Sequence, residues 1–116
     1  MATVSSHVLD SVRGTHAAGI RCQLYRRLRD APSELVFDVK ADTEGRISEE
    51  VEVEKATRDA EYELVFHNGA YFSMQSSRFD TVVETIVIRF VITDNHKRYH
   101  LPVMMSPHSY STWWSS

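Results

Sequence analysis

The chain has 116 residues, a formal net charge of −3 and a single cysteine. This length gives one domain, residues 1–116, that can bury a core without crosslinks, and one cysteine excludes an internal disulfide framework. The 13 Lys and Arg residues are scattered and form no basic stripe, so no nucleic acid partner is expected.

Segments that direct a protein into or across a membrane are not evident. The start of the chain lacks the basic and apolar regions of a secretory signal. The longest apolar stretch, from Ile86 to Ile92, is short and is interrupted by Arg89. We therefore expect no membrane partner and a cytoplasmic location.

The first half of the chain alternates apolar and polar residues, which is typical of strands. The expected elements are, in chain order, a strand at 7–10, a turn around Gly14, a strand at 20–26 with Ile20, Cys22, Leu24 and Arg26 on one face, a strand at 35–40 with Leu35, Phe37 and Val39 on one face, and a turn at 42–45 in which Gly45 takes a positive φ.

The second half continues the pattern. The segment 49–63 is interpreted as a solvated edge and loop with at most one short strand. The remaining expected elements are a strand at 62–67, one short helix within 68–79, a strand at 85–93 with Ile86, Ile88, Phe90 and Ile92 in strict alternation, and strands at 99–105 and 109–114 separated by Pro107. About eight short strands at regular spacing predict an all-β, two-sheet sandwich with one short helix.

Histidines stand in the first and in the second-last of these strands. Period two places Ser5, His7 and Leu9 on one face, while His100 shares a face with Met104. Pro102 lies on the same face as His100 and Met104. Another face carries Ser111, Trp113 and Ser115. If these faces look the same way, they form a groove with two imidazoles, hydroxyl groups and an apolar wall, which is typical of a small-molecule site.

Each candidate residue also has a structural interpretation. A lone strand histidine is commonly a satisfied structural residue, Arg46 after a turn is commonly a surface charge, and Trp113 can be a core or interface anchor. The other histidines, His16, His67, His96 and His108, are interpreted as surface residues. No zinc motif is present, so no metal is expected, although histidines meeting across chains could bind zinc adventitiously.

Four motifs carry a family resemblance. They are His-Val-Leu-Asp at 7–10, Asp-Thr-Glu-Gly-Arg at 42–46, Tyr-His-Leu-Pro-Val-Met-Met-Ser-Pro at 99–107 and Tyr-Ser-Thr at 110–112. In this order and spacing they resemble the transthyretin-like 5-hydroxyisourate hydrolases. His7, Arg46 and His100 fall where the hydrolases differ from the hormone carrier transthyretin, which lacks both histidines.

The resemblance implies a fold, an assembly and an activity. The fold is a two-sheet sandwich, and four copies form a homotetramer, a dimer of dimers around a central channel. The implied activity opens the cyclic amide ring of 5-hydroxyisourate, an oxidation product of urate, with water and without a cofactor. Active sites at the channel ends are shared between chains.

The resemblance also implies roles for individual residues. His7 and His100 activate water and transfer protons, without a choice between them, and Arg46 stabilises the developing negative charge. Ser111, Trp113 and Ser116 are the expected substrate-binding residues.

The chain departs from the family pattern at two places. The family closes on Tyr-Arg-Gly-Ser, whereas this chain has Trp113, Trp114, Ser115 and Ser116. An indole cannot replace a guanidinium that contacts an anionic ligand. His16 also stands where a proline often follows the first turn. These departures leave two alternatives open: a non-catalytic tetramer that binds an aromatic or hormone-like ligand in its channel, and a tetramer whose site has decayed.

Overall fold

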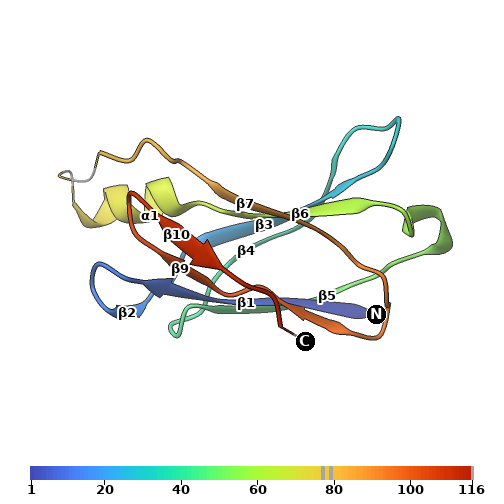
Figure 1. Cartoon of the computed structure of the whole chain (residues 1–116), viewed down its shortest axis with the longest axis horizontal. Helices are drawn as coiled ribbons and strands as arrows, with labels where there is room; N and C mark the ends of the chain where they lie inside the picture. The colour runs from blue at the N-terminus through green and yellow to red at the C-terminus, as the bar shows by residue number, and fades with distance from the viewer. Residues whose placement is uncertain (77, 79, 116) are drawn as a thin grey trace.

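Two sheets pack face to face in the computed structural model, which describes residues 1–76, 78 and 80–115 (Figure 1). The elements in chain order are β1 (Ala2–Asp10), β2 (Thr15–His16), β3 (Arg21–Arg27), β4 (Glu34–Lys40), β5 (Arg46–Val51), a 3-10 turn η1 (Lys55–Thr57), β6 (Glu61–Phe66), α1 (Asn68–Gln75), β7 (Ile86–Val91), β8 (Arg98–His100), β9 (Val103–Met105) and β10 (Tyr110–Thr112). The predicted all-β sandwich with one short helix is confirmed.

Strand β1 is the centre of the first sheet. It pairs antiparallel with β2 and β5 and parallel with β8 and β9, while β10 lies outside β9. The strand begins earlier than the predicted 7–10, because its two consecutive serines are buried through hydrogen bonds. Ser5 Oγ lies 2.9 Å from Nδ1 of His100, and Ser6 Oγ donates to the carbonyl oxygen of Leu101 at 2.6 Å.

The second sheet has the order β4-β3-β6-β7 and supplies the other half of the core. Cys22, Leu24 and Arg26 are buried on one face of β3, as predicted. The guanidinium of Arg26 donates to the hydroxyl of Tyr62, to Glu34 and to the carbonyl oxygen of Glu52. A buried charge needs such partners, because burial without them costs several kcal/mol.

One predicted strand face is wrong at Leu35. The pairing of β3 with β4 shifts between Leu24 and Tyr25, so that Leu24 lies opposite Phe37 and Tyr25 lies opposite Leu35. This β-bulge inserts Val36 and reverses the face of the residue before it. Leu35 is therefore 50% exposed, while Val36 packs against the core.

The predicted strand 99–105 is divided by Pro102, which has no N–H to give to the sheet. Residues 101 and 102 belong to no strand, and β8 and β9 lie on either side of them. This division and the two-residue β2 raise the number of strands in the described residues from the expected eight to ten.

The predicted helix forms, although it is shorter than the segment 68–79. Gly69 sits at its start, where an added Cβ would lie 3.0 Å from Cα of Glu84. Its N–H donates to the carbonyl oxygen of Glu84, and Asn68 Nδ2 donates to the carbonyl oxygen of Val83. The close contact between the helix and the segment before β7 thus requires a residue without a side chain.

Strand β7 is an edge strand that pairs with β6 alone among the described strands. Its alternation is as predicted, with Ile86 buried and Ile88 and Phe90 packed against the core. Val87 and Val91 face outward and are 45% and 53% exposed. The strand covers residues 86–91 of the predicted 85–93.

Candidate active site

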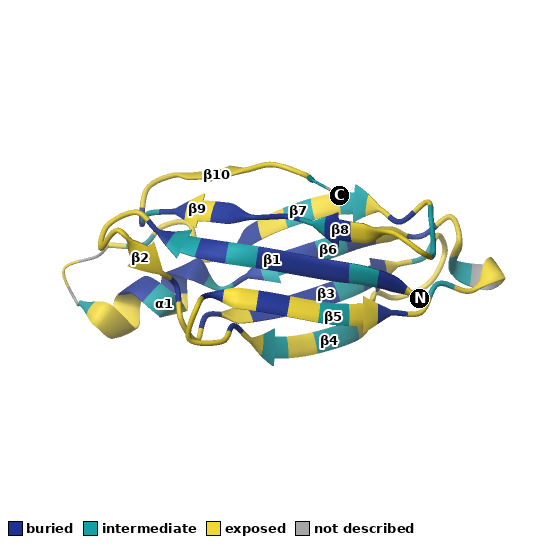
Figure 2. Ribbon diagram, turned by 90° about the horizontal axis from the view of Figure 1, so that it is seen from below, coloured by how far each residue is buried: buried dark blue, intermediate teal, exposed yellow. Residues whose placement is uncertain are grey.

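The outward face of β1 carries Thr3, Ser5, His7 and Leu9, because alternate residues of a strand point to the same side. The residues between them, such as Val4 and Val8, are buried in the core. Figure 2 shows β1 with β5 along one side and β8 and β9 along the other. Side chains from these neighbouring strands therefore meet those of β1 on this face.

Strand register brings together three of the predicted site residues. His7 lies directly opposite Arg46 in the pairing of β1 with β5. Ser5 lies opposite His100 in the pairing of β1 with β8. Ser5 and His7 are two residues apart on one strand, which is a distance of about 7 Å. The two imidazoles and the guanidinium therefore share one face of the sheet.

His100 is held at one ring nitrogen and at its backbone. Its Nδ1 lies 2.9 Å from Ser5 Oγ. Its backbone N–H and carbonyl oxygen both bond to the backbone of Ser115 at 3.0 Å, which ties the end of the described chain to β8. Among the described residues, none bonds to Nε2 of His100.

Burial lowers the pKa of His100 below its ordinary value, and the positive charges of Arg98 and Arg46 lower it further. An imidazole whose pKa lies below its ordinary value is neutral at neutral pH and keeps a lone pair on one ring nitrogen. When Nδ1–H of His100 donates to Ser5, that lone pair is on Nε2. In that tautomer His100 can accept a proton at Nε2.

His7 is held by a different partner. Its Nε2 lies 3.0 Å from Nδ1 of His16, and the two ring centroids are 5.1 Å apart. Burial lowers the pKa of His7, as do the charges of Arg46 and His16, while a hydrogen bond to the backbone of Glu44 acts in the opposite direction. His7 is therefore also neutral at neutral pH.

Arg46 follows a tight turn whose first residue, Asp42, organises the backbone. Asp42 Oδ1 accepts the N–H groups of Glu44 at 2.9 Å and Arg46 at 3.0 Å. These bonds lower the pKa of Asp42, since they stabilise the carboxylate. The guanidinium of Arg46 forms no ion pair within the described chain, so its charge is free to meet an anion.

The predicted substrate-binding residues lie farther from the histidines. Ser111 is exposed and lies opposite Met104, which in turn lies opposite Leu9 of β1. Trp113 is 49% exposed and lines a cavity of about 510 Å³ between the C-terminal segment and β7. Ser116 lies outside the described residues.

Two other histidines form contacts that the sequence did not predict. His16 is exposed, as expected, but it contacts His7 directly. The turn around Gly14 is the sequence feature that indicates its return to β1. His67 reaches the surface, but its side chain is half-buried and its Nε2 lies 2.7 Å from Gln23 Oε1.

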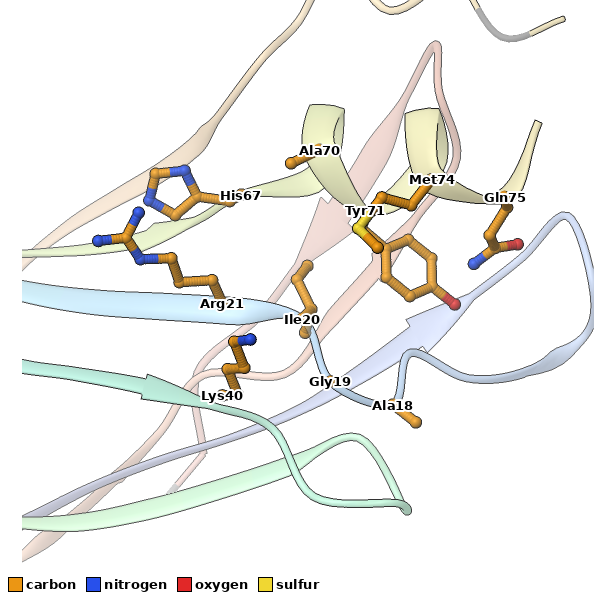
Figure 3. Close-up of a pocket in the computed structure, with 10 residues that line it drawn as sticks. All are labelled: Ala18, Gly19, Ile20, Arg21, Lys40, His67, Ala70, Tyr71, Met74 and Gln75. Carbon is orange, nitrogen blue, oxygen red and sulfur yellow. The ribbon is translucent and has the colours of Figure 1, made fainter. Parts of the chain in front are cut away.

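A second hollow lies beside α1 (Figure 3). It has a volume of about 460 Å³, with Arg21, Lys40 and His67 toward one end and Tyr71 and Met74 toward the other. Arg21 is already engaged by Asp38 at 2.6 Å. None of the predicted site residues lines this hollow.

Two kinds of feature are absent from the described chain. No group of three or more His, Cys, Asp or Glu side chains within it is arranged to hold a metal ion. No helix within it has the length and apolarity to cross a bilayer.

Similar proteins and a family profile all point to one family. The profile of the HIUase/Transthyretin family matches residues 4–114. The chain is 34% identical over 112 residues to 5-hydroxyisourate hydrolase 2 of Rhizobium meliloti, covering 95% of this chain and 92% of that protein. It is 32% identical over 115 residues to 5-hydroxyisourate hydrolase of Pseudomonas aeruginosa, covering 97% and 90%.

Solved structures agree with these matches. The Klebsiella pneumoniae 5-hydroxyisourate hydrolase superposes with a TM-score of 0.77 over the whole of both chains, at 29% identity. A crystal structure of (S)-allantoin synthase superposes with a TM-score of 0.79 at 29% identity, and this chain spans 44% of its length. With its fold, its paired histidine strands and these relatives, the chain belongs to the HIUase/Transthyretin family.

Proposed function

We propose that this protein is a 5-hydroxyisourate hydrolase, which opens the cyclic amide ring of its substrate with water in urate catabolism. The observation that carries the proposal is the strand register that sets His7 opposite Arg46 and His100 opposite Ser5 on one face. Two relatives named 5-hydroxyisourate hydrolase, which match this chain over nearly their whole length, support it. Simple binding of an apolar ligand does not require two neutral imidazoles beside a free guanidinium.

His100 acts as the general base of this reaction. Its Nε2 takes a proton from the attacking water, while Nδ1–H remains bonded to Ser5. The hydroxide adds to the carbonyl carbon of the cyclic amide, and the carbonyl oxygen gains the negative charge. An imidazole in this position is worth roughly 10²–10⁴-fold in rate.

Arg46 and His7 serve the later part of the reaction. The guanidinium of Arg46 binds the developing oxyanion, whose charge it stabilises. The tetrahedral adduct then breaks its carbon–nitrogen bond, and the leaving nitrogen receives a proton. His7 is the second proton-transfer group, since it shares the face with Arg46 and lies within electrostatic range of His100.

The substrate contacts and the assembly belong to the same proposal. Ser111, Trp113 and Ser116 bind the substrate in a homotetramer whose sites are shared between chains. The exposed apolar side chains of β7, β10 and the C-terminal segment support an interface between copies; they are Val87, Val91, Tyr110, Trp113 and Trp114. The cytoplasmic location stays a prediction.

A second candidate function is supported by the cavity beside β7. Its lining includes Phe90, Tyr99, Trp113 and Trp114, which are suited to an aromatic ligand. In this alternative the family assembly holds such a ligand without turnover, and the histidines do no chemistry.

The deciding experiment mixes purified protein with freshly generated 5-hydroxyisourate and follows its ultraviolet absorbance. We expect the decay to exceed the rate in buffer and to fall roughly 10²–10⁴-fold in His100→Ala and in His7→Ala. His96→Ala, which changes an exposed loop histidine, is the matched control. Decay at the buffer rate, together with saturable binding of an aromatic ligand, would establish the alternative.

A further inference from the structure

A third histidine stands in the candidate site because of the β1–β2 hairpin. His16 lies opposite Leu9 in the pairing of these strands, so its side chain is the diagonal neighbour of His7 on the same face. Nδ1 of His16 lies 3.0 Å from Nε2 of His7, and the ring planes are tilted by 35°. This contact links a half-buried imidazole to an exposed one.

Two sets of contacts fix the hairpin that carries His16. The buried carboxylate of Asp10 accepts the N–H groups of Val12 and Arg13 and the hydroxyl of Tyr71. On the other side the turn before β5 packs against β2, where an added Cβ at Gly45 would lie 3.3 Å from Cβ of His16. The approach of the two imidazoles is thus set by the backbone.

The ring nitrogens of His7 and His16 differ in their hydrogen-bond partners. Nε2 of His7 is engaged by Nδ1 of His16, which leaves Nδ1 of His7 as the nitrogen that can transfer a proton to the substrate. Nε2 of His16 has no partner in the described part of the chain. When Nδ1–H of His16 donates to Nε2 of His7, the lone pair of the two-ring unit is on Nε2 of His16, on the exposed side.

We propose that His16 is the positioning and proton-exchange partner of His7, so that the two rings take up and release one proton as a unit. Uptake adds a proton to Nε2 of His16, and the proton on its Nδ1 passes to Nε2 of His7. Release is the reverse, with the proton leaving to water. A second proton is opposed by the charge already on the unit and by Arg46.

The charged and titratable groups around the pair come from every neighbouring element. Arg46 and Glu44 belong to β5 and the turn before it, Asp42 begins that turn, and His100 lies on β8. The charges of Arg46 and His16 oppose protonation of His7, whereas the charge of Glu44 favours it. Removal of His16 changes one member of this set and leaves the others in place.

The first test needs no substrate. Imidazole nitrogen resonances of the intact protein are followed by NMR as a function of pH in wild type, His16→Ala and the control His96→Ala. In His16→Ala we expect His7 to titrate at a higher pH than in wild type, because the charge of His16 lowers its pKa. Identical titration of His7 in wild type and His16→Ala would overturn the proposal.

The second test measures turnover and therefore rests on the proposed function. We expect kcat of His16→Ala to fall about tenfold, with KM unchanged, since a relay contributes less than the roughly 10²–10⁴-fold of a direct group. Added imidazole restores the rate if proton exchange is the lost property. A loss of rate that imidazole does not restore would overturn it. Absence of turnover in wild type would refute the proposed function alone, and the NMR titration then decides the role of His16.

Discussion

At the residue scale, the candidate site keeps its imidazoles neutral by placing them beside a fixed positive charge. Arg46 lowers the pKa of His7 and of His100, in addition to the effect of burial. In the proposed mechanism the same guanidinium stabilises the oxyanion, so Arg46 both keeps the base neutral and binds the charge that forms when water attacks. Neither histidine needs a carboxylate partner for this, unlike the histidine of a Ser-His-Asp triad.

The pH dependence of turnover follows from these shifts. The base must be neutral to accept a proton. Because the pKa of His100 is lowered from its ordinary value of 6.5, the imidazole is still mostly neutral at pH 6.5. We expect kcat to hold as pH falls to 6.5 and to decline only at lower pH. In Arg46→Gln the His7 and His100 resonances titrate at higher pH, because the opposing charge is gone. An acid limb at or above 6.5 in wild type would contradict this assignment.

The altered closing residues predict a weakened enzyme. Restoring the family ending through Trp113→Tyr, Trp114→Arg and Ser115→Gly adds a guanidinium beside the substrate. A charge-assisted hydrogen bond is worth about 1.5–3 kcal/mol, which corresponds to roughly 10- to 150-fold in kcat/KM. The same variant with Gln in place of Arg at 114 supplies the neutral control. Equal kcat/KM in wild type, restored and control proteins would show that the native ending costs nothing.

Individual residues were predictable where a periodic pattern and a motif coincide. His7 and His100 satisfy both conditions, whereas Arg46 was indicated by a motif and a turn alone; the strand registers bring the three together. His16 was not predicted, because its contact depends on a two-residue strand that periodicity cannot detect. The half-buried position of His67 depends on a hydrogen bond to Gln23 from another strand, which no local pattern indicates.

At the element scale, the turn at 42–45 joins the fold to the site. Gly45 has φ +72°, and its N–H donates to the carbonyl oxygen of Asp42. An added Cβ would lie 2.5 Å from the carbonyl oxygen of Val8 in β1. The turn therefore presses on β1 next to His7 and delivers Arg46 to the opposite position.

Substitution of this glycine separates backbone strain from steric contact. Gly45→Ala is expected to lower the free energy of unfolding, since a strained residue costs about 1–3 kcal/mol and a clash adds to this. Gly19→Ala is the matched control, because Gly19 has φ +77° but no atom within 4 Å of an added Cβ. Urea unfolding should show a larger loss in Gly45→Ala, and equal losses would mean that the contact with Val8 is readily relieved.

Strands and the helix were predicted better than their ends. The alternation of β3, β6 and β7 is strong because one face of each is buried. The reversal at Leu35 was not predictable, since a β-bulge depends on the partner strand rather than on the strand itself. Pro102 was read as part of a strand, although its missing N–H divides β8 from β9.

At the scale of the whole molecule, exposed apolar side chains gather at one edge. Strand β7 and the C-terminal segment border the cavity of about 510 Å³, and Val91 and Trp114 are 53% and 57% exposed there. An unpaired edge strand with apolar neighbours favours association with a second copy. These exposed apolar side chains therefore support the proposed tetramer.

Light scattering at micromolar concentration is expected to give about four chain masses. Val91→Lys places a charge at the β7 edge and should produce smaller species with lower turnover. Val12→Lys changes a valine of similar exposure in the β1–β2 turn and should leave the mass unchanged. A wild-type monomer at all concentrations would contradict both the assembly and the shared site.

The architecture as a whole was predictable from the number and spacing of strands, but the neighbours of β1 were not. Parallel pairing of β1 with β8 and β9 joins segments from opposite ends of the chain, which no local pattern specifies. The family motifs indicated that these segments belong together, while the register supplied the contacts. The sequence therefore predicted which segments meet at the candidate site better than the contacts that they form there.

The position of β1 at the centre of its sheet has a consequence for biosynthesis. Ser5 and His100 are separated by 95 residues, so β1 leaves the ribosome long before its partners β8 and β9 exist. At roughly 5–20 residues per second this interval lasts roughly 5–20 s. During it a strand with buried apolar residues has an open edge, which is the state that chaperones protect. The candidate site is therefore among the last parts of the molecule to form, when nascent β8 docks beside Ser5.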